Sequence, residues 1–479
     1  MNGGKFYRIV LITVIVCQSL VFSCNNRRNP NLSEKQLRAL MNDSAQNATE
    51  IPFTFLSDTN YIPPAGAKFK EIRSIDPSAP PALIDIAGNL ENKKEFKLSD
   101  IASSVRYIHL QQPPDIKFSS IYDLVTDDEH IFINTLDGLF CYSVEGRYLY
   151  TVCKNQVVNE GNFGRHLVMG SMWGKIDLLN GMLVSRFIHW PLDGGDTDTH
   201  LNFFDVREMD AQMLFNYPSD ELRNTGVKPK YHRRLDPQKT GSRTQYLLMD
   251  NQSLFINNSL TSITLYGDTL CKFNNYDLPT LAPEARRVAF FSDIYRINGQ
   301  MMLRKDNSDT VFRVLPPNRL IPAYVMQWGE YKQDINQHAA GSALEGKLVF
   351  SDWVETPRFI FIEYTEGRNY PARRNQVQYY WAIYDKTAKT LTHLNAPPKP
   401  ALLEVVGGAG MKLNMIENDI DPVGMPFWPK GVNHKNEMYM IFSKERIKRL
   451  IETGRYSNDK LQAIYDNMPD GGFGIMIVK

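Results

Sequence analysis

Short runs of β-forming residues, separated by tight turns, recur along most of this chain and limit the folds it can adopt. The clearest series spans residues 121–153. Four runs are separated there by turn sequences rich in Asp, Glu and Gly, namely Asp127-Asp128-Glu129, Asp137-Gly138 and Glu145-Gly146. This pattern predicts four antiparallel strands joined by tight turns, the meander that forms one blade of a β-propeller.

Weaker copies of the same pattern follow this first series. They fall at residues 175–189, 246–273, 288–314, 349–394 and from about 421 to 478. Because aromatic residues make up 11% of the sequence, the composition also suits pleated, half-buried strands. We therefore expect an all-β fold, a six-bladed β-propeller spanning residues 84–479. Repeat length alone leaves the number open, since short blades of ~40–45 residues would allow about nine.

Two short amphipathic helices are expected near the C-terminus. Ser443 can cap the first, which Gly454 ends, and Pro469 ends the second. Their apolar residues recur at helical spacing: Ile447, Leu450 and Ile451, then Leu461, Ile464, Tyr465 and Met468. We expect both helices to pack on the propeller.

The first residues have the composition of a bacterial lipoprotein signal peptide. Lys5 and Arg8 precede an apolar run of about a dozen residues, fewer than the ~20 that a membrane-spanning helix needs. The run ends in Leu20-Val21-Phe22-Ser23-Cys24, which resembles a lipobox. We predict cleavage before Cys24 and lipid attachment to its thiol, with more than one acyl chain holding the protein on a membrane. An ordinary signal peptide followed by an incidental cysteine is the alternative.

These features divide the chain into a signal peptide at residues 1–23, a lipidated cysteine and tether at residues 24–83, and the propeller at residues 84–479. The formal net charge is +1, and removal of residues 1–23 leaves 52 basic against 53 acidic residues. A nearly neutral chain argues against nucleic acid as a partner, because phosphate contacts need a basic surplus or patch.

Three cysteines other than Cys24 remain in the processed chain: Cys141, Cys153 and Cys271. A tight turn at Val144-Glu145-Gly146 would place Cys141 opposite about Leu149 rather than opposite Cys153. We therefore expect free, buried thiols rather than a cross-strand disulfide.

Two polar clusters are candidates for binding. Asn418, Asp419 and Asp421, with Trp428 nearby, lie where the first strand of the last blade would face the central channel, and we take them as ligand-binding candidates. Asx turns that cap the start of a strand are the simpler interpretation. As paired acids they would also suit glycosidase chemistry, given a suitable separation.

The second cluster is a loop whose carboxylates are weak candidates for Ca²⁺ ligands: Asp193, Asp196 and Asp198. It does not match an EF-hand, and a solvated loop between strands is the alternative. The sequence has no G-x-S-x-G, H-E-x-x-H or C-x-x-C motif and no glycine-rich phosphate loop. We therefore name no catalytic residue, no metal site beyond this loop and no cofactor.

Several segments resemble the six-bladed β-propeller lipoproteins of the Bacteroidales. They are Ile84-Asp85-Ile86 with residues 96–101 and 105–110, residues 309–314 with 323–325, Asn418–Asp421 with Pro426-Phe427-Trp428-Pro429, and residues 474–479. Departures occur at residues 155–163 and at Pro422-Val423-Gly424. The resemblance implies a six-bladed propeller that ends in two helices and a final strand. Since open sheet edges promote aggregation, we also expect residues 96–110 and 473–478 to meet and close the ring.

Acidic residues directly after the lipidated cysteine are associated with surface export in the hosts of that family. Here Cys24 is followed by Asn25-Asn26-Arg27-Arg28. We accordingly expect an outer-membrane lipoprotein on the periplasmic face, with surface exposure left open. We expect a non-catalytic module that binds a small ligand, a glycan or an envelope protein. A carbohydrate-processing hydrolase or lyase and a scaffold subunit of an envelope complex are the alternatives.

Overall fold

The computed structural model describes most of the chain between residues 80 and 479, together with residues 56–57. Side chains are described chiefly within residues 80–153, 292–366, 378–395 and 415–479, apart from short gaps. For most of residues 154–291, only the backbones of strands are described. Cys24 and the predicted signal peptide at residues 1–23 lie outside the described residues. No helix in the described part of the chain is long and apolar enough to cross a membrane.

The first meander forms the four-stranded antiparallel sheet that its turns predict, here called the first blade. Its strands are β5 (Ile121–Thr126), β6 (His130–Thr135), β7 (Gly138–Ser143) and β8 (Tyr148–Lys154). Gly138 and Gly146 adopt positive φ in its turns, at +148° and +88°. The turn residues therefore set the strand boundaries, because glycine alone takes up such angles without steric cost.

Two further meanders form antiparallel sheets of the same kind. The β19 blade contains β19 (Ser292–Ile297), β20 (Gln300–Lys305), β21 (Thr310–Leu315) and β22 (Arg319–Gln327). The β23 blade contains β23 (Leu348–Glu355), β24 (Phe359–Glu366), β25 (Gln378–Asp385) and β26 (Thr390–Leu394). The short 3₁₀ helix η5 (Gly329–Tyr331) follows β22.

Strands also form in the meander segments expected between the first blade and the β19 blade. One sheet contains β9 (Gln156–Asn159), β10 (Arg165–Gly170), β11 (Ile176–Leu179), β12 (Met182–Pro191), β13 (Asp198–Asp205), β14 (Gln212–Tyr217) and β15 (Lys230–Tyr231). Another contains β16 (Tyr246–Asp250), β17 (Leu260–Thr264) and β18 (Thr269–Phe273). A separate hairpin is formed by β27 (Leu402–Val406) and β28 (Ala409–Lys412).

The closing blade joins the two ends of the propeller. It consists of β29 (Gly431–Val432), β30 (Met438–Ser443), β31 (Phe473–Val478) and, at its outer edge, β4 (Val105–His109). Strand β4 pairs antiparallel with β31, from Gly474 opposite His109 to Val478 opposite Val105. The expected meeting of residues 96–110 and 473–478 is therefore confirmed in a single sheet.

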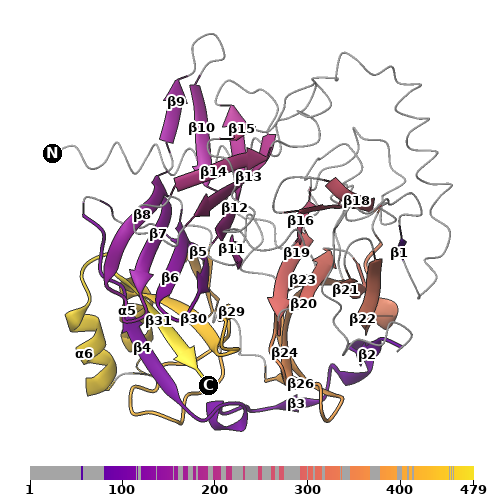
Figure 1. Cartoon of the computed structure of the whole chain (residues 1–479). Helices are drawn as coiled ribbons and strands as arrows, with labels where there is room; N and C mark the ends of the chain where they lie inside the picture. The colour runs from indigo at the N-terminus through magenta and orange to yellow at the C-terminus, as the bar shows by residue number, and fades with distance from the viewer. Residues whose placement is uncertain are drawn as a thin grey trace.

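Residues 80–110 run along the outer edges of three blades in succession, and we call them the belt. Strand β2 (Ala82–Asp85) pairs parallel with β22, β3 (Lys93–Lys94) pairs parallel with β26, and β4 pairs with β31. The 3₁₀ helices η1 (Ala87–Asn89) and η2 (Leu98–Asp100) connect these strands. Figure 1 shows this indigo to purple segment passing below the blades from β2 through β3 to β4. Each pairing covers backbone groups that an edge strand would leave open. Strand β1 (Leu56–Ser57), within the predicted tether, also pairs with β22.

The blades stack face to face through apolar cores, giving a propeller-like fold with four blades. Alternation along β31 sends Ile475 and Ile477 into a core shared with the first blade, and Met476 and Val478 into a core shared with the β23 blade. The opposite face of the β23 blade packs on the β19 blade through Ile360, Ile362, Met302, Val311 and Tyr324. The first blade contacts β11 and β12 through Phe132, Leu139, Ile176 and Leu183.

The two predicted helices occur where the sequence places them. They are α5 (Lys444–Glu452) and α6 (Asp459–Asn467). Ser443 accepts a hydrogen bond from the Arg446 backbone N–H at 3.2 Å, as expected of a cap. Ile447, Leu450 and Leu461 are fully buried in the core between the closing blade and the β23 blade. The helices therefore pack on the propeller, as predicted.

The cysteines of the first blade are free, but their register differs by one residue from the expectation. Cys141 lies opposite Tyr150 rather than Leu149, and Cys153 lies opposite Leu139. The pairing of β7 with β8 shifts at two irregularities, one on each side of Cys141. Bulges of this kind insert a residue that a regular turn-to-strand count misses. Cys271 pairs with Ser262 through its backbone, and its side chain lies outside the described residues.

Gly146 provides a test of the contact between the first blade and the belt. Its carbonyl accepts a hydrogen bond from the Gln111 N–H at 2.8 Å, and a Cβ added to it would lie 2.2 Å from the His109 carbonyl oxygen. Gly146→Ala should lower the free energy of unfolding by about 1–3 kcal/mol more than Gly454→Ala in urea titrations. Gly454 also has positive φ, at +70°, but no atom within 4 Å of an added Cβ. Equal losses in the two variants would show that this contact does not constrain the blade.

His393 anchors the belt to the β23 blade and makes stability depend on pH. Its N–H donates to the Asn92 carbonyl at 2.8 Å, and its imidazole contacts the Tyr364 hydroxyl. Burial lowers the pKa of His393 to about 4. The unfolded chain therefore takes up a proton below about pH 6.5 that the folded chain takes up only near 4, so stability falls as the pH drops through this window.

His393→Phe should flatten this dependence. Between pH 7.5 and 5.0, the free energy of unfolding should fall by about 2 kcal/mol less in the variant than in the parent protein. Urea titrations at the two pH values measure both slopes. Parallel slopes would contradict the assignment, even if the variant is less stable at every pH.

Candidate functional site

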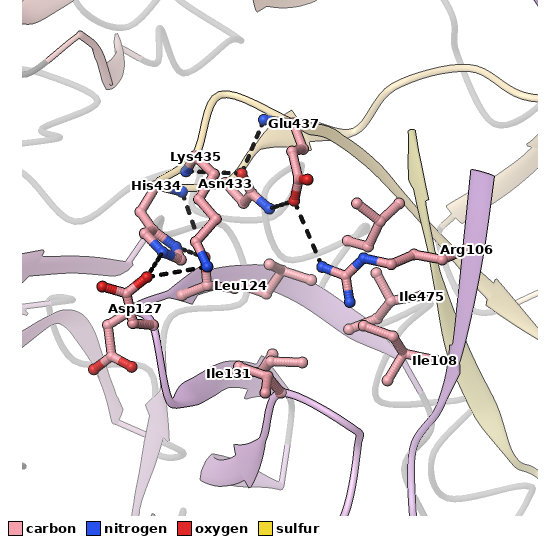
Figure 2. Close-up of a pocket in the computed structure, with 14 residues that line it drawn as sticks. Arg106, Ile108, Leu124, Asp127, Ile131, Asn433, His434, Lys435, Glu437 and Ile475 are labelled. Carbon is pink, nitrogen blue, oxygen red and sulfur yellow. Dashed lines mark hydrogen bonds and ion pairs between the residues drawn. The ribbon is translucent and has the colours of Figure 1, made fainter. Parts of the chain in front are cut away.

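A pocket of about 290 Å³ lies between the first blade and the closing blade. Its apolar lining is Ile108, Leu124, Ile131, Val144, Ile475 and Ile477, and its polar lining is Arg106, Thr126, Asp127, Asp128, Asn433, His434, Lys435 and Glu437. Figure 2 shows Glu437, Asn433, His434 and Lys435 above the branched side chains, with Arg106 beside them and Asp127 at the left. The pocket thus has an aliphatic floor and a charged rim.

Strand alternation builds the floor. Arg106 and Ile108 lie two residues apart on β4 and so share a face, as do Ile475 and Ile477 on the neighbouring β31. Leu124 and Ile131 come from β5 and β6 of the first blade. All of these aliphatic side chains are buried. The floor is therefore part of the core that holds the ring closed.

One side of the rim is an ion pair above the floor. The Arg106 Nη2 lies 3.5 Å from the Glu437 Oε2, and the Arg106 side chain is 53% exposed. Asn433 holds Glu437 in place by donating from Nδ2 to Oε2 at 2.8 Å, while its own Oδ1 accepts from the Glu437 N–H at 2.9 Å. Glu437 is therefore a positioned carboxylate next to a guanidinium that extends toward solvent.

The other side of the rim joins two turns. The β5–β6 turn contributes Asp128, whose Oδ1 lies 3.0 Å from the Lys435 Nζ and 3.2 Å from the His434 Nε2. The His434 Nδ1 also lies 2.6 Å from the Thr126 hydroxyl. Hydrogen bonds from Lys435 and His434 lower the pKa of Asp128. These contacts hold the turn between β29 and β30 against the first blade.

The predicted ligand-binding residues come together in one loop, at the outer edge of the closing blade rather than at its inner strand. Asp419 accepts hydrogen bonds from the Ser99 N–H at 2.9 Å and from its hydroxyl at 2.6 Å. Asp421 accepts from the Asn418 Nδ2 at 2.8 Å, from the Tyr107 hydroxyl at 3.1 Å and from the Val423 N–H at 2.7 Å. The polar groups of this loop therefore bind the belt.

Asn418 and Asp421 both form the Asx turns of the simpler interpretation, since each accepts a hydrogen bond from the N–H two residues on. Asn418 and Trp428 are buried, at 5% exposure each. The Trp428 ring packs edge-on against Phe361, with centroids 5.5 Å apart. A ligand role for these residues stays a prediction.

The acidic loop of the weak calcium candidates falls largely outside the described residues. Asp193 and Asp196 lie outside them, and Asp198 begins β13, opposite His189, with its side chain undescribed. Among the side chains that are described, no group of three or more His, Cys, Asp or Glu residues is arranged to hold a metal ion.

Charged residues converge where the first strands of several sheets meet. The Lys430 Nζ, directly before β29, lies 3.5 Å from the Asp352 Oδ2 of β23. The negative charge of Asp352 raises the pKa of Lys430 most. Smaller contributions in the same direction come from Asp123, Asp293 and Glu363. On the neighbouring strands, Arg296 of β19 contacts Asp177 of β11 at 2.8 Å. The acids of several sheets therefore come together around Lys430 rather than at the loop of Asn418.

The rim residues of the pocket were not singled out by the sequence. Arg106 and Glu437 lie more than 300 positions apart, so no local motif contains both. One signal was present: Arg106 interrupts the otherwise apolar or aromatic run from Val105 to Leu110. Charged residues are common on the solvent side of strands, so this signal alone did not locate the pocket.

The fold and the pocket define a propeller-like β-protein with a pocket between two blades. Residues 64–453 match the family DUF4933, described as a domain of unknown function, and the chain belongs to this family. No curated protein matches the sequence.

Two solved structures from Bacteroides are similar over much of the chain. One, from Bacteroides fragilis, is named as an exported protein. It is 10% identical in sequence, with a TM-score of 0.49, and the match covers 83% of this chain and 99% of the Bacteroides fragilis chain. The other is a protein of unknown function from Bacteroides caccae, 12% identical in sequence, with a TM-score of 0.32. The match covers 58% of this chain and 81% of the Bacteroides caccae chain. No function is transferred from either.

Proposed function

We propose that this protein is an exported, lipid-anchored β-propeller that binds a ligand without catalysis in the cell envelope. The pocket between the first blade and the closing blade carries this proposal. It combines a floor of buried aliphatic side chains with polar groups that hydrogen bonds and ion pairs hold in position, and small-molecule sites combine these two kinds of group. The proposed anchor is Cys24, and the proposed location is the periplasmic face of the outer membrane.

A six-bladed ring is part of the same proposal. The sheet of β9–β15 and the sheet of β16–β18 lie in chain order between the first blade and the β19 blade. Counted with the four blades, they would make six. The contact of β11 with β5 supports a place for the first of these sheets beside the first blade.

A glycan-processing enzyme has less support from the pocket. None of its 14 lining residues has an aromatic ring other than the imidazole of His434, so it offers no Trp, Tyr or Phe face for a sugar to stack on. The acids Asp419 and Asp421 are engaged by Ser99, Tyr107 and Asn418. Carboxylates held in this way favour a structural over a catalytic role.

Membrane anchoring is tested by Cys24→Ala. The parent protein should remain with the membrane fraction after lysis, whereas the variant should appear in the soluble fraction, because acyl chains hold the parent protein on the bilayer. Cys17→Ala, within the apolar run, is the control and should leave fractionation unchanged. Membrane retention of the Cys24→Ala variant would refute the lipid anchor.

Ligand binding is tested by a thermal-shift screen of the mature full-length protein against amino acids, sugars, nucleotides and fatty acids. A true ligand at 100 times its Kd should add about 2.7 kcal/mol to the free energy of unfolding. The shift should shrink in Arg106→Gln, and mass spectrometry should recover the ligand unchanged. Conversion of the ligand to a product would replace the binding proposal with an enzyme. A screen without any stabilising compound would contradict the proposal.

A further inference from the structure

The geometry of the pocket points to a free aliphatic α-amino acid, such as leucine or isoleucine, as its ligand. This inference rests on the proposed function and names its ligand class. Such a ligand has a carboxylate, an ammonium group and a branched apolar side chain joined at one carbon. The pocket offers a matching group for each of the three.

Arg106 would take the carboxylate. Within the described residues, its guanidinium contacts only the Glu437 carboxylate, through Nη2 at 3.5 Å. A guanidinium has five N–H donors in a planar fork, so most of them remain for a ligand. Two of these N–H groups can bind both oxygens of one carboxylate, the strongest arrangement for this pair of groups.

Glu437 would take the ammonium group. Its Oε2 receives the Asn433 Nδ2 and lies near Arg106, whereas its Oε1 accepts no hydrogen bond from the described part of the chain. The Glu437 side chain is 15% exposed, and Asn433 fixes its orientation. A positioned acceptor of this kind binds an ammonium group with little loss of side-chain freedom.

The Arg106 guanidinium and the Glu437 carboxylate lie side by side, so one ligand that carries adjacent opposite charges can reach both. In Figure 2 the Arg106 guanidinium reaches toward the Glu437 carboxylate, and a dashed line joins the two groups. The ion pair is 3.5 Å long and its guanidinium is about half exposed, so solvent screens it and a ligand can exchange its own charges for it. A ligand with a single charge would break the ion pair but could replace the lost contact of only one of its two members, Arg106 or Glu437.

The floor would take the side chain. Ile108 and Ile475 lie below the Arg106–Glu437 pair, with Leu124 beside them (Figure 2). Branched aliphatic residues offer close contact to another branched aliphatic group and no hydrogen bond to a polar one. The volume of about 290 Å³ is near the lower end of the roughly 300–1,000 Å³ typical of small-molecule sites, which favours a ligand of this size.

Titration calorimetry of the mature full-length protein tests the inference. L-Leucine or L-isoleucine should bind, and glycine should bind at least about 10-fold more weakly because it buries no side chain. 4-Methylpentanoate lacks the ammonium group of leucine, and leucinamide lacks its carboxylate. Each should bind about 10- to 100-fold more weakly than leucine, since each loses one charge-assisted contact.

Two variants locate the site. Arg106→Gln should weaken leucine binding about 10- to 100-fold but leave leucinamide binding nearly unchanged. Glu437→Gln should weaken leucine binding by a similar factor but leave 4-methylpentanoate binding nearly unchanged. Lys460→Gln removes the same charge from α6, on the far side of the closing blade, and should bind leucine as the parent protein does. Unchanged melting temperatures would show that all three variants are folded.

Several results would overturn the inference. Equal binding of leucine and 4-methylpentanoate would exclude recognition of both charges, and full leucine binding by Arg106→Gln would place the site elsewhere. Failure of every aliphatic amino acid, while another class of compound stabilises the protein in the screen, would reject the amino acid and leave the proposed binding function standing.

Discussion

The pairing of β4 with β31 is the interaction on which the rest of the structure depends. It completes the closing blade from residues near both ends of the propeller and fixes one face of that blade against the first blade. The belt extends the same principle to two more outer edges, at β22 and β26. An open edge strand presents unpaired backbone groups to any other chain. The belt covers three such edges with one continuous segment.

The local part of the fold could be predicted because turns carry their own chemistry. Asp137-Gly138 and Glu145-Gly146 each mark a hairpin, and Gly138 and Gly146 adopt positive φ. Apolar residues at every second position then predicted the strands, and apolar residues at helical spacing predicted α5 and α6. The register around Cys141 was missed by one residue because bulges leave no mark in the apolar pattern. The parallel pairs of β2 and β3 were missed because two to four residues carry too little pattern.

The candidate site shows the limit of sequence reasoning more clearly. Clusters close in sequence, such as Asn418, Asp419 and Asp421, attract attention because they are visible as motifs. In the structure they bind Ser99 and Tyr107 of the belt and stabilise the closure. The pocket instead takes Arg106 from one end of the propeller and Glu437 from the other. A site assembled by ring closure has no local motif, and only the fold brings its residues together.

Placing the closing strand near the N-terminus also has a consequence for synthesis. Strand β4 is made more than 360 residues before its partner β31. Closing so long a loop is costly in entropy until the intervening blades have formed. A chain truncated before β31 would keep Ile108 uncovered and the edge of β4 unpaired, in a form open to proteases. Closure in this topology therefore has to wait until β31 has been made, and a shorter chain keeps the edge of β4 open.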